Sequence, residues 1–169
     1  MLNRDFKEFA ESLNARGVEY LVVGGYALAA HGHPRYTGDI DFWVRPSTDN
    51  LARLLDALKD FGFGSLGLSA SDFDPNTVVQ LGQPPQRIDL LTSIDGVNFD
   101  ECFARREQVE LAGVHLNIIG LDDFKTNKQA RGRLKDLADL ESLEPGFARV
   151  PGRAPAAKLK SPKACGFRA

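Results

Sequence analysis

Residues 22–42 read VVGGYALAAHGHPRYTGDIDF, a stretch that combines two apolar runs with a glycine pair and two closely spaced aspartates. Residues 20–23 and 39–44 are short, mainly apolar runs of the length that is typical of strands. Residues 26–30 between them suit a helix, which a histidine-glycine pair and then a proline would end. The stretch therefore predicts a strand, a glycine pair, a short helix and a second strand in direct succession.

Asp39 and Asp41 are separated by one apolar residue inside the second of these strands. Because successive side chains of a strand point to opposite faces, both carboxylates should lie on one face, with Ile40 and Phe42 on the other. Two close carboxylates repel each other unless a hard cation lies between them. Mg2+ suits this position, since it accepts one or two carboxylates and takes other ligands from water and phosphates. The pattern predicts a divalent-metal site that would bind a nucleotide.

The glycine pair Gly24-Gly25 predicts where the phosphates of that nucleotide would lie. Glycine allows a ligand to approach the backbone closely, and this pair begins the predicted helix. Backbone N–H groups and the helix dipole at such a position attract phosphate. Gly24 and Gly25 are therefore predicted to bind the β- and γ-phosphates of a nucleoside triphosphate.

The rest of the chain alternates between helix and strand patterns. Residues 3–16 predict a helix that Gly17 ends, and Ser47 or Thr48 would cap a helix that ends at residues 61–62. The other predicted elements are an antiparallel pair of strands at 77–81 and 87–91, a hairpin of strands at 108–111 and 114–118, and helices at 121–131 and 134–143. Helices combined with a mixed, partly antiparallel sheet predict one α/β or α+β domain with C-terminal helices.

Asp89 lies between Ile88 and Leu90 in the predicted strand at 87–91. A carboxylate in the apolar centre of a strand is costly unless it is paired, exposed or bound to a metal ion. Asp89 is therefore the natural third ligand of the predicted metal site.

Histidine and cysteine do not strengthen this metal site. His31 and His33 lie close to the aspartates in sequence, but Mg2+ prefers oxygen ligands, so local packing explains them better. Cys102 and Cys165 are far apart and lack the spacing of metal ligands, so neither is predicted as a site.

Length and composition indicate one domain in an aqueous compartment. The chain has 169 residues, of which 43% are hydrophobic and 26% charged, and these are ordinary values for a globular protein. No apolar run approaches the roughly 20 residues that span a bilayer, and the N-terminus lacks the apolar stretch of a signal peptide. We therefore expect a cytoplasmic protein without a membrane segment.

Residues 146–169 form a basic tail, rich in Pro and Ala, after a predicted domain of residues 1–145. The tail carries six Lys or Arg residues and no acid, whereas the whole chain has a net charge of -2. Its composition predicts disorder, because it lacks enough apolar surface to form a core. A nucleic-acid-binding arm is the alternative interpretation, since such charges add salt-dependent affinity for phosphate backbones.

Taken together, these motifs resemble the signature of the DNA polymerase β-type nucleotidyltransferase superfamily. Its pattern is an apolar residue with Gly-Gly or Gly-Ser, a spacer, and then an Asp-apolar-Asp-apolar strand like residues 39–42. The sequence Arg87-Ile88-Asp89-Leu90-Leu91 is similar to the strand that holds the third carboxylate of the family. Residues 121–139 resemble the C-terminal motif of minimal bacterial members, including abortive-infection toxins of the AbiEii type. The resemblance covers about residues 18–143.

The resemblance implies a nucleotidyltransferase fold and the transfer of a nucleoside monophosphate from an NTP, which is the substrate. Asp39 and Asp41 would hold two Mg2+ ions, one bound to the triphosphate and one lowering the pKa of the acceptor hydroxyl. Asp89 would complete the shell of the second ion and could take the acceptor proton. Gly25 stands where the family often has serine, whose hydroxyl binds phosphate. Phosphate binding here would therefore depend more on backbone N–H groups and basic side chains.

Four further side chains are candidates for binding the nucleotide. Arg35 is a candidate cation for the phosphates, and pairing with a nearby acid is an equal alternative. Thr37 could donate a hydrogen bond or shape the turn before the strand. Lys128 and Arg133 belong to the C-terminal motif, and a solvated helix face is the competing explanation for each.

Three classes of function stay open at this point. The first is an enzyme whose acceptor is RNA, a protein or a small molecule. Such an enzyme could act as the toxin of a toxin-antitoxin or abortive-infection system and would then have an antitoxin partner. The second is an interaction protein that keeps the carboxylates but has lost turnover. The third and weakest is a metal-dependent phosphohydrolase, which would normally show histidine-aspartate clusters.

Overall fold

The structure is a computed structural model that describes residues 2–144. The helices are α1 (Arg4–Ala15), α2 (Gly24–Ala30), α3 (Thr48–Leu58), α4 (Phe99–Ala104), α5 (Leu121–Arg131) and α6 (Leu134–Ser142). The strands are β1 (Tyr20–Val23), β2 (Asp39–Val44), β3 (Val78–Leu81), β4 (Arg87–Leu91), β5 (Glu107–Leu111) and β6 (Val114–Ile118). The predicted tail at 146–169 lies outside the described residues.

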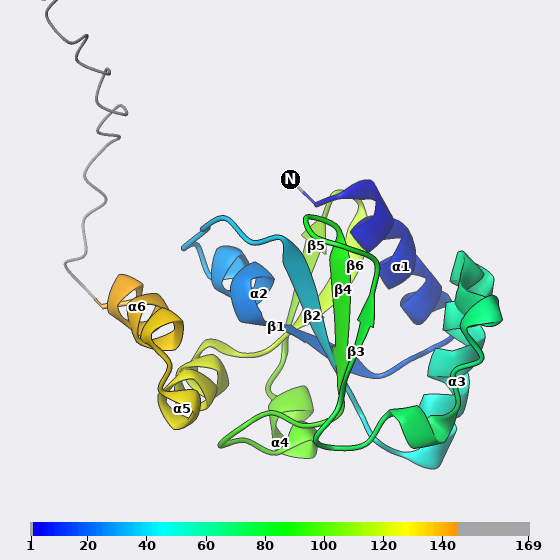
Figure 1. Cartoon of the computed structure of the whole chain (residues 1–169). Coiled ribbons are helices and arrows are strands. Elements are labelled where there is room, and N and C mark those ends of the chain that lie inside the picture. Colours follow the sequence, from blue (N-terminus) through cyan, green and yellow to red (C-terminus); the bar gives the residue numbers. More distant parts are fainter. Residues whose placement is uncertain (1, 145–169) are drawn as a thin grey trace, which may run out of the picture.

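The six strands form one mixed sheet in the order β3-β4-β2-β1-β6-β5. The pairs β2–β4 and β1–β6 are parallel, and the other three pairs are antiparallel. The predicted pairing of β3 with β4 and the predicted β5–β6 hairpin are both confirmed. Figure 1 shows α1 and α3 on one side of the sheet and α2, α5 and α6 on the other. The fold is thus the predicted mixed sheet flanked by helices.

Local sequence explains where several helices begin and end. The side chain of Asn3 accepts a hydrogen bond from the Asp5 N–H at the start of α1, and Ser47 accepts one from Asn50 at the start of α3. The sequence predicted that α3 would reach residue 62, but it ends at Leu58 and continues as a wider π-helical turn to Phe63. Gly62 has φ 104° inside this turn, a conformation that ends regular helix.

The strand β2 divides its side chains between the two faces of the sheet as predicted. Ile40 and Phe42 are completely buried, and the Phe42 ring packs edge-on against Phe9 of α1 at 5.4 Å. Asp39 and Asp41 point to the opposite face and are only partly buried. The α1–α3 side of the sheet therefore holds apolar core, and the α2 side holds the carboxylates.

The helix α4 was not predicted from the sequence, and it covers part of the carboxylate side of the sheet. Trp43 is 2% exposed and packs against Phe99 of α4 with ring centroids 5.1 Å apart. Trp43 is therefore part of the core between the sheet and α4. Within residues 2–144, no helix is both long and apolar enough to cross a membrane.

Candidate functional site

A cavity of about 190 Å3 lies on the carboxylate side of the sheet, between the strands and the C-terminal helices. Three acids and six basic side chains line it, together with both glycines of the pair. They are Asp39, Asp41 and Asp89, then Arg35, Arg87, Lys128, Arg131, Arg133 and Lys135, and Gly24 and Gly25. The structure thus brings together nearly every residue that the sequence predicted for the site.

The strand register places the three acids side by side. In the parallel pair β2–β4, Asp41 lies opposite Asp89, and Asp39 lies opposite Arg87. Residues two apart on a strand share a face, so all four side chains project toward the cavity. Asp89 is 5% exposed although it carries an ionisable carboxyl group. Such burial of an acid requires a cationic partner.

Gly24 is required by the close approach of Asp41. Val23, the last residue of β1, pairs with Asp41 of β2 and directly precedes Gly24. A Cβ atom at Gly24 would lie 2.1 Å from Oδ2 of Asp41, which is far inside van der Waals contact. Gly24 also has φ +66°, a conformation that other L-residues adopt only with strain. The glycine therefore makes room for the carboxylate in addition to allowing the turn.

The substitution Gly24→Ala should lower stability and displace Asp41, and Gly17→Ala is its matched control. Gly17 has nearly the same φ, +64°, but a Cβ there would meet no atom within 4 Å. Gly17→Ala should cost about 1 to 2 kcal/mol of unfolding free energy from backbone strain alone. Gly24→Ala should cost clearly more and also weaken nucleotide binding. Urea unfolding and calorimetry measure both effects, and equal losses for the two variants would contradict this account.

Gly25 is packed against Thr37, which in turn orients Asp39. A Cβ at Gly25 would lie 3.0 Å from both Cβ and Oγ1 of Thr37, so a serine there would crowd the threonine. The Thr37 hydroxyl donates to Oδ1 of Asp39 at 2.7 Å. Thr37, predicted as a nucleotide ligand, thus holds one of the carboxylates in this structure.

Arg87 lies between two of the acids. Its Nε donates to Oδ1 of Asp89 at 2.7 Å, and its Nη2 donates to Oδ2 of Asp39 at 2.8 Å and to Oδ2 of Asp89 at 2.9 Å. Asp41 has no hydrogen-bond or salt-bridge partner for its carboxylate among the described side chains. Burial, followed by the charges of Asp39 and Asp89, raises the pKa of Asp41 to about 6.

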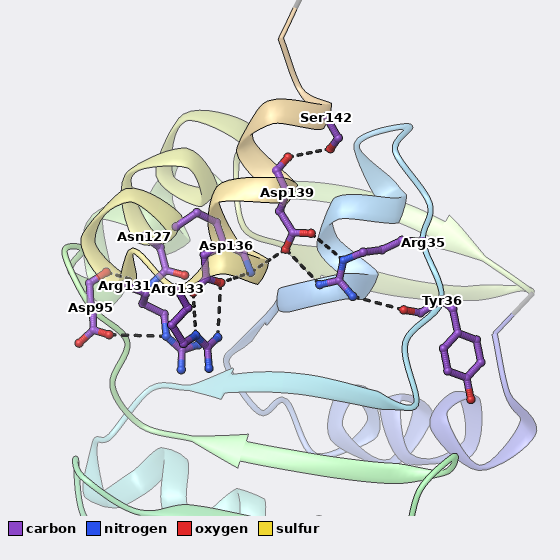
Figure 2. Close-up of polar contacts among 10 residues, drawn as sticks. Arg35, Tyr36, Asp95, Asn127, Arg131, Arg133, Asp136, Asp139 and Ser142 are labelled. Atoms are coloured by element: carbon purple, nitrogen blue, oxygen red, sulfur yellow. Dashed lines mark hydrogen bonds and ion pairs between the residues drawn. The ribbon is translucent and has the colours of Figure 1, made fainter. Parts of the chain in front are cut away.

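Lys128 is buried in an ion-pair cluster rather than solvated. The residue is 3% exposed, and its Nζ donates to Asp136 at 2.8 Å and lies 2.9 Å from Asp139. Two arginines that were predicted to bind the nucleotide join the same acids. Figure 2 shows Arg35 reaching Asp139, with bonds of 2.6 and 3.0 Å, and Arg133 reaching Asp136 at 2.7 Å. The cluster ties α5 and α6 to the segment before β2.

The acids of this cluster are held in the charged form. Burial alone would raise the pKa of Asp136, but hydrogen bonds from Arg133 and Lys128 outweigh it and hold the pKa far below its usual range. Burial would also raise the pKa of Asp139, but hydrogen bonds from Arg35 and Lys128 outweigh it and lower the pKa. The alternative in which Arg35 pairs with an acid is therefore what the structure shows, and Asp136 orients Arg133.

Two basic residues at the rim were not predicted. Arg131 ends α5 and approaches only Asp95, at 3.6 Å, and Lys135 in α6 is exposed without an ion pair among residues 2–144. Their cationic groups are the least engaged of those that line the cavity. The spacing of three between Lys128 and Arg131 on one helix is the signal that could have identified Arg131. Arg87 was identifiable in the same way, because it stands two residues before Asp89 on a strand.

Other candidates lie apart from this cavity. The Nε2 of His31 lies 2.8 Å from the Ile119 carbonyl oxygen, in agreement with a packing role. Cys102 is buried, and Cys165 lies outside the described residues. Among residues 2–144, no three His, Cys, Asp or Glu side chains converge in the way that would hold one metal ion. The Arg87 guanidinium bridges Asp39 and Asp89, and Asp41 takes no part in this bridge.

Comparison with known proteins agrees with this fold. A family model described as "Nucleotidyl transferase of unknown function (DUF2204)" matches residues 2–159. The crystal structure of a candidate nucleotidyltransferase from Thermotoga maritima is similar, with a TM-score of 0.54 and 15% identity over 83% of this chain and 88% of that chain. At that identity the likeness shows the fold alone. No curated protein matches the chain.

Proposed function

Because the chain belongs to this family of nucleotidyl transferases of unknown function, we propose that it is a Mg2+-dependent nucleotidyltransferase. It would transfer a nucleoside monophosphate from an NTP to a hydroxyl group of RNA, a protein or a small molecule. One observation supports this most strongly: three carboxylates and six basic side chains line one cavity. Acids bind metal ions and basic groups bind phosphates, so a metal-triphosphate ligand satisfies both sets.

The donor set fits Mg2+ by its chemistry. The three aspartates supply only oxygen ligands from one face of two adjacent strands, and hard cations prefer such ligands. Asp41 has a raised pKa and forms no ion pair among the described residues, although the charges of Lys128 and Arg131 act on it from a distance. A bound divalent ion would supply a much closer positive charge. Asp39 and Asp41 would hold the ions, with Asp89 as the third ligand once Arg87 has moved. Bound there, Mg2+ would polarise the phosphates and lower the pKa of the acceptor hydroxyl.

The protein groups have separate tasks in the proposed reaction. The acceptor oxygen forms a bond to the α-phosphorus, the bond from that phosphorus to the bridging oxygen breaks, and pyrophosphate leaves. Arg131 and Lys135 offset the charge of the departing phosphates, since their side chains are the least engaged at the rim. Asp89 takes the acceptor proton. Gly24 leaves room for the Asp41 carboxylate in the cavity, because a Cβ at this position would lie 2.1 Å from Oδ2 of Asp41.

The cavity has room for the phosphates but not for the whole nucleotide. Its volume of about 190 Å3 is below the roughly 300 Å3 at which pockets for drug-sized ligands begin. The sugar and base would therefore extend beyond it toward solvent. Recognition of the base and of the acceptor would then use the rim or a partner molecule.

A transfer assay tests the proposal. The full chain is incubated with each radiolabelled NTP, Mg2+ and RNA, protein or small-molecule acceptors, and both labelled product and pyrophosphate are measured. Equal amounts of the two products, lost when EDTA replaces Mg2+, are the expected result. Failure with every NTP, together with an absence of Mg2+-dependent nucleotide binding, would contradict the proposal.

A role as the toxin of an abortive-infection or toxin-antitoxin system, with an antitoxin partner, is the finer form of this proposal. It is supported by the likeness of residues 121–139 to the C-terminal motif of that branch. The second candidate is a non-catalytic interaction protein on the same fold. One observation favours it, namely that Arg87 fills the space between Asp39 and Asp89. Nucleotide binding without transfer would support that alternative.

A further inference from the structure

Arg87 is placed where it contacts the same oxygens that a metal ion would use. The side chain projects from β4 on the face that carries Asp89, and across β2–β4 it lies opposite Asp39. Its guanidinium makes three hydrogen bonds of 2.7 to 2.9 Å to these two carboxylates. Charge-assisted bonds of this length are strong, and the guanidinium group is always protonated. The two acids therefore already share one positive charge that belongs to the chain.

A divalent ion would have to compete with the guanidinium for these oxygens. Mg2+ takes ligand oxygens at about 2.0 to 2.1 Å in octahedral geometry, and both oxygens of Asp89 and Oδ2 of Asp39 already accept hydrogen bonds from Arg87. Arg87 and the ion also repel each other electrostatically. Binding of the ion to the full set of aspartates therefore requires that the Arg87 side chain leaves them.

A nucleoside triphosphate would give Arg87 another partner. Phosphate oxygens accept the same bidentate bonds from guanidinium as carboxylates do. Arg87 lines the cavity in which the phosphates would lie, so the side chain can change partners by rotation alone. Entry of the nucleotide would then release the aspartates at the moment when the ion arrives with the phosphates.

We propose that Arg87 competes with the divalent ion for Asp39 and Asp89, so that this site binds metal strongly only together with a nucleoside triphosphate. This inference rests on the proposed function, because it assumes that these carboxylates are the metal ligands. Arg87 acts as a positioning residue in this scheme and couples two binding events. The metal affinity of the nucleotide-free protein is lowered in proportion to the small fraction of molecules in which Arg87 has left the acids.

Binding of Mn2+ to the full chain, measured by electron paramagnetic resonance, tests the coupling. Mn2+ is a paramagnetic substitute with the same oxygen preference. The variants are Arg87→Gln and Arg87→Lys, and Arg45→Gln is the matched control, because Arg45 pairs with Glu19 and Asp100 away from the cavity. Each protein is titrated alone and with a non-hydrolysable triphosphate analogue.

Wild type should bind Mn2+ weakly alone and at least about 10-fold more tightly with the analogue. Arg87→Gln should bind Mn2+ about 10-fold more tightly than wild type without the analogue, and the gain on adding the analogue should shrink. Arg87→Lys has a single ammonium group in place of the two-pronged guanidinium, so its Mn2+ affinity should lie between those of wild type and Arg87→Gln. Arg45→Gln should match wild type.

Thermal unfolding separates a folding defect from a binding effect. Arg87→Gln leaves Asp39 and Asp89 without their cation, so its Tm in EDTA should fall, and Mn2+ should raise it by more than it raises the wild-type Tm. If Arg87→Gln does not fold, the same comparison is made with Arg87→Lys. Unchanged or weaker Mn2+ binding by the variants, with nucleotide-dependent binding in wild type, would overturn this inference and leave the proposed function intact. An absence of Mn2+ binding in all proteins, with and without the analogue, would overturn both.

Discussion

Replacing Asp41 with asparagine is expected to abolish nucleotidyl transfer while making the protein more stable. The substitution preserves size but removes the charge that would bind the ion, and the rate should fall by more than about 100-fold, the upper range for loss of an outer-shell partner of a metal. Stability should rise because burial and the neighbouring acids raise the pKa of Asp41 to about 6. A carboxyl group with a raised folded-state pKa destabilises the protein once it is ionised.

The unfolding free energy of Asp41→Asn should exceed that of wild type by on the order of 1 kcal/mol near neutral pH in EDTA. This difference should disappear as pH falls and the wild-type carboxyl becomes protonated. Pyrophosphate release and urea unfolding measure the two effects. Asp60→Asn is the control, since Asp60 is an exposed acid whose pKa is lowered by its bond to Arg16. It should keep full activity and show no gain in stability. Loss of both activity and stability in Asp41→Asn would mean that Asp41 is structural.

Replacing Lys128 with methionine is expected to produce the largest loss of stability. Methionine fills a similar volume, but Asp136 and Asp139, which are 0% and 2% exposed, would lose their shared partner. Breaking a buried ion pair from one side typically costs about 3 to 5 kcal/mol, because a charge stays buried without compensation. Arg133 and Arg35 still contact these acids, so we expect the lower end of this range. Urea unfolding at neutral pH measures the loss.

The stability lost in Lys128→Met should be smaller in acid than at neutral pH. Because Lys128 and the arginines lower the pKa of Asp136 and Asp139, these acids stabilise the fold above the unfolded-state pKa of about 4 and cease to do so as pH falls below it. The gap between wild type and Lys128→Met should therefore narrow in acid. Lys125→Met on the same helix is the control, since Lys125 has no ion pair among residues 2–144. A similar loss for both variants would contradict a specific role for the cluster.

The backbone plan was predictable from the sequence because the decisive signals are local. The strands β1, β2, β4 and β6 and the helix α5 were predicted with their observed bounds, since short apolar runs and caps mark their ends. The helix α4 escaped prediction because its six residues are too few to show helical periodicity. It exists through packing of Phe99 on Trp43 and capping by Asn98, and packing of this kind is set by tertiary structure.

The aspartates and glycines that line the cavity were predictable for the same reason, whereas the ion pairs of its basic residues were not. Strand alternation alone puts Asp39 and Asp41 on one face, and glycines mark a close approach. The partners of Lys128, Arg35 and Arg133 depend on how α6 folds back, which no local pattern records. From the sequence, Arg35 was equally a candidate for phosphate and for an acid, and Lys128 and Arg133 were candidates for phosphate or for a solvated face. All three bind Asp136 or Asp139 in the structure. The less engaged cations are Arg131 and Lys135.

Calorimetric titration with nucleotide, in Mg2+ and in EDTA, tests whether Asp39, Asp41 and Asp89 form a site for a metal-triphosphate complex. Such binding can be measured without knowledge of the acceptor. Non-hydrolysable analogues of the four NTPs are titrated into wild type, Asp41→Asn and Asp60→Asn. We predict binding of at least one analogue in Mg2+ that is lost in EDTA and in Asp41→Asn but is retained in Asp60→Asn. Binding that is equally strong without Mg2+ or in Asp41→Asn, or no binding of any analogue, would contradict the account.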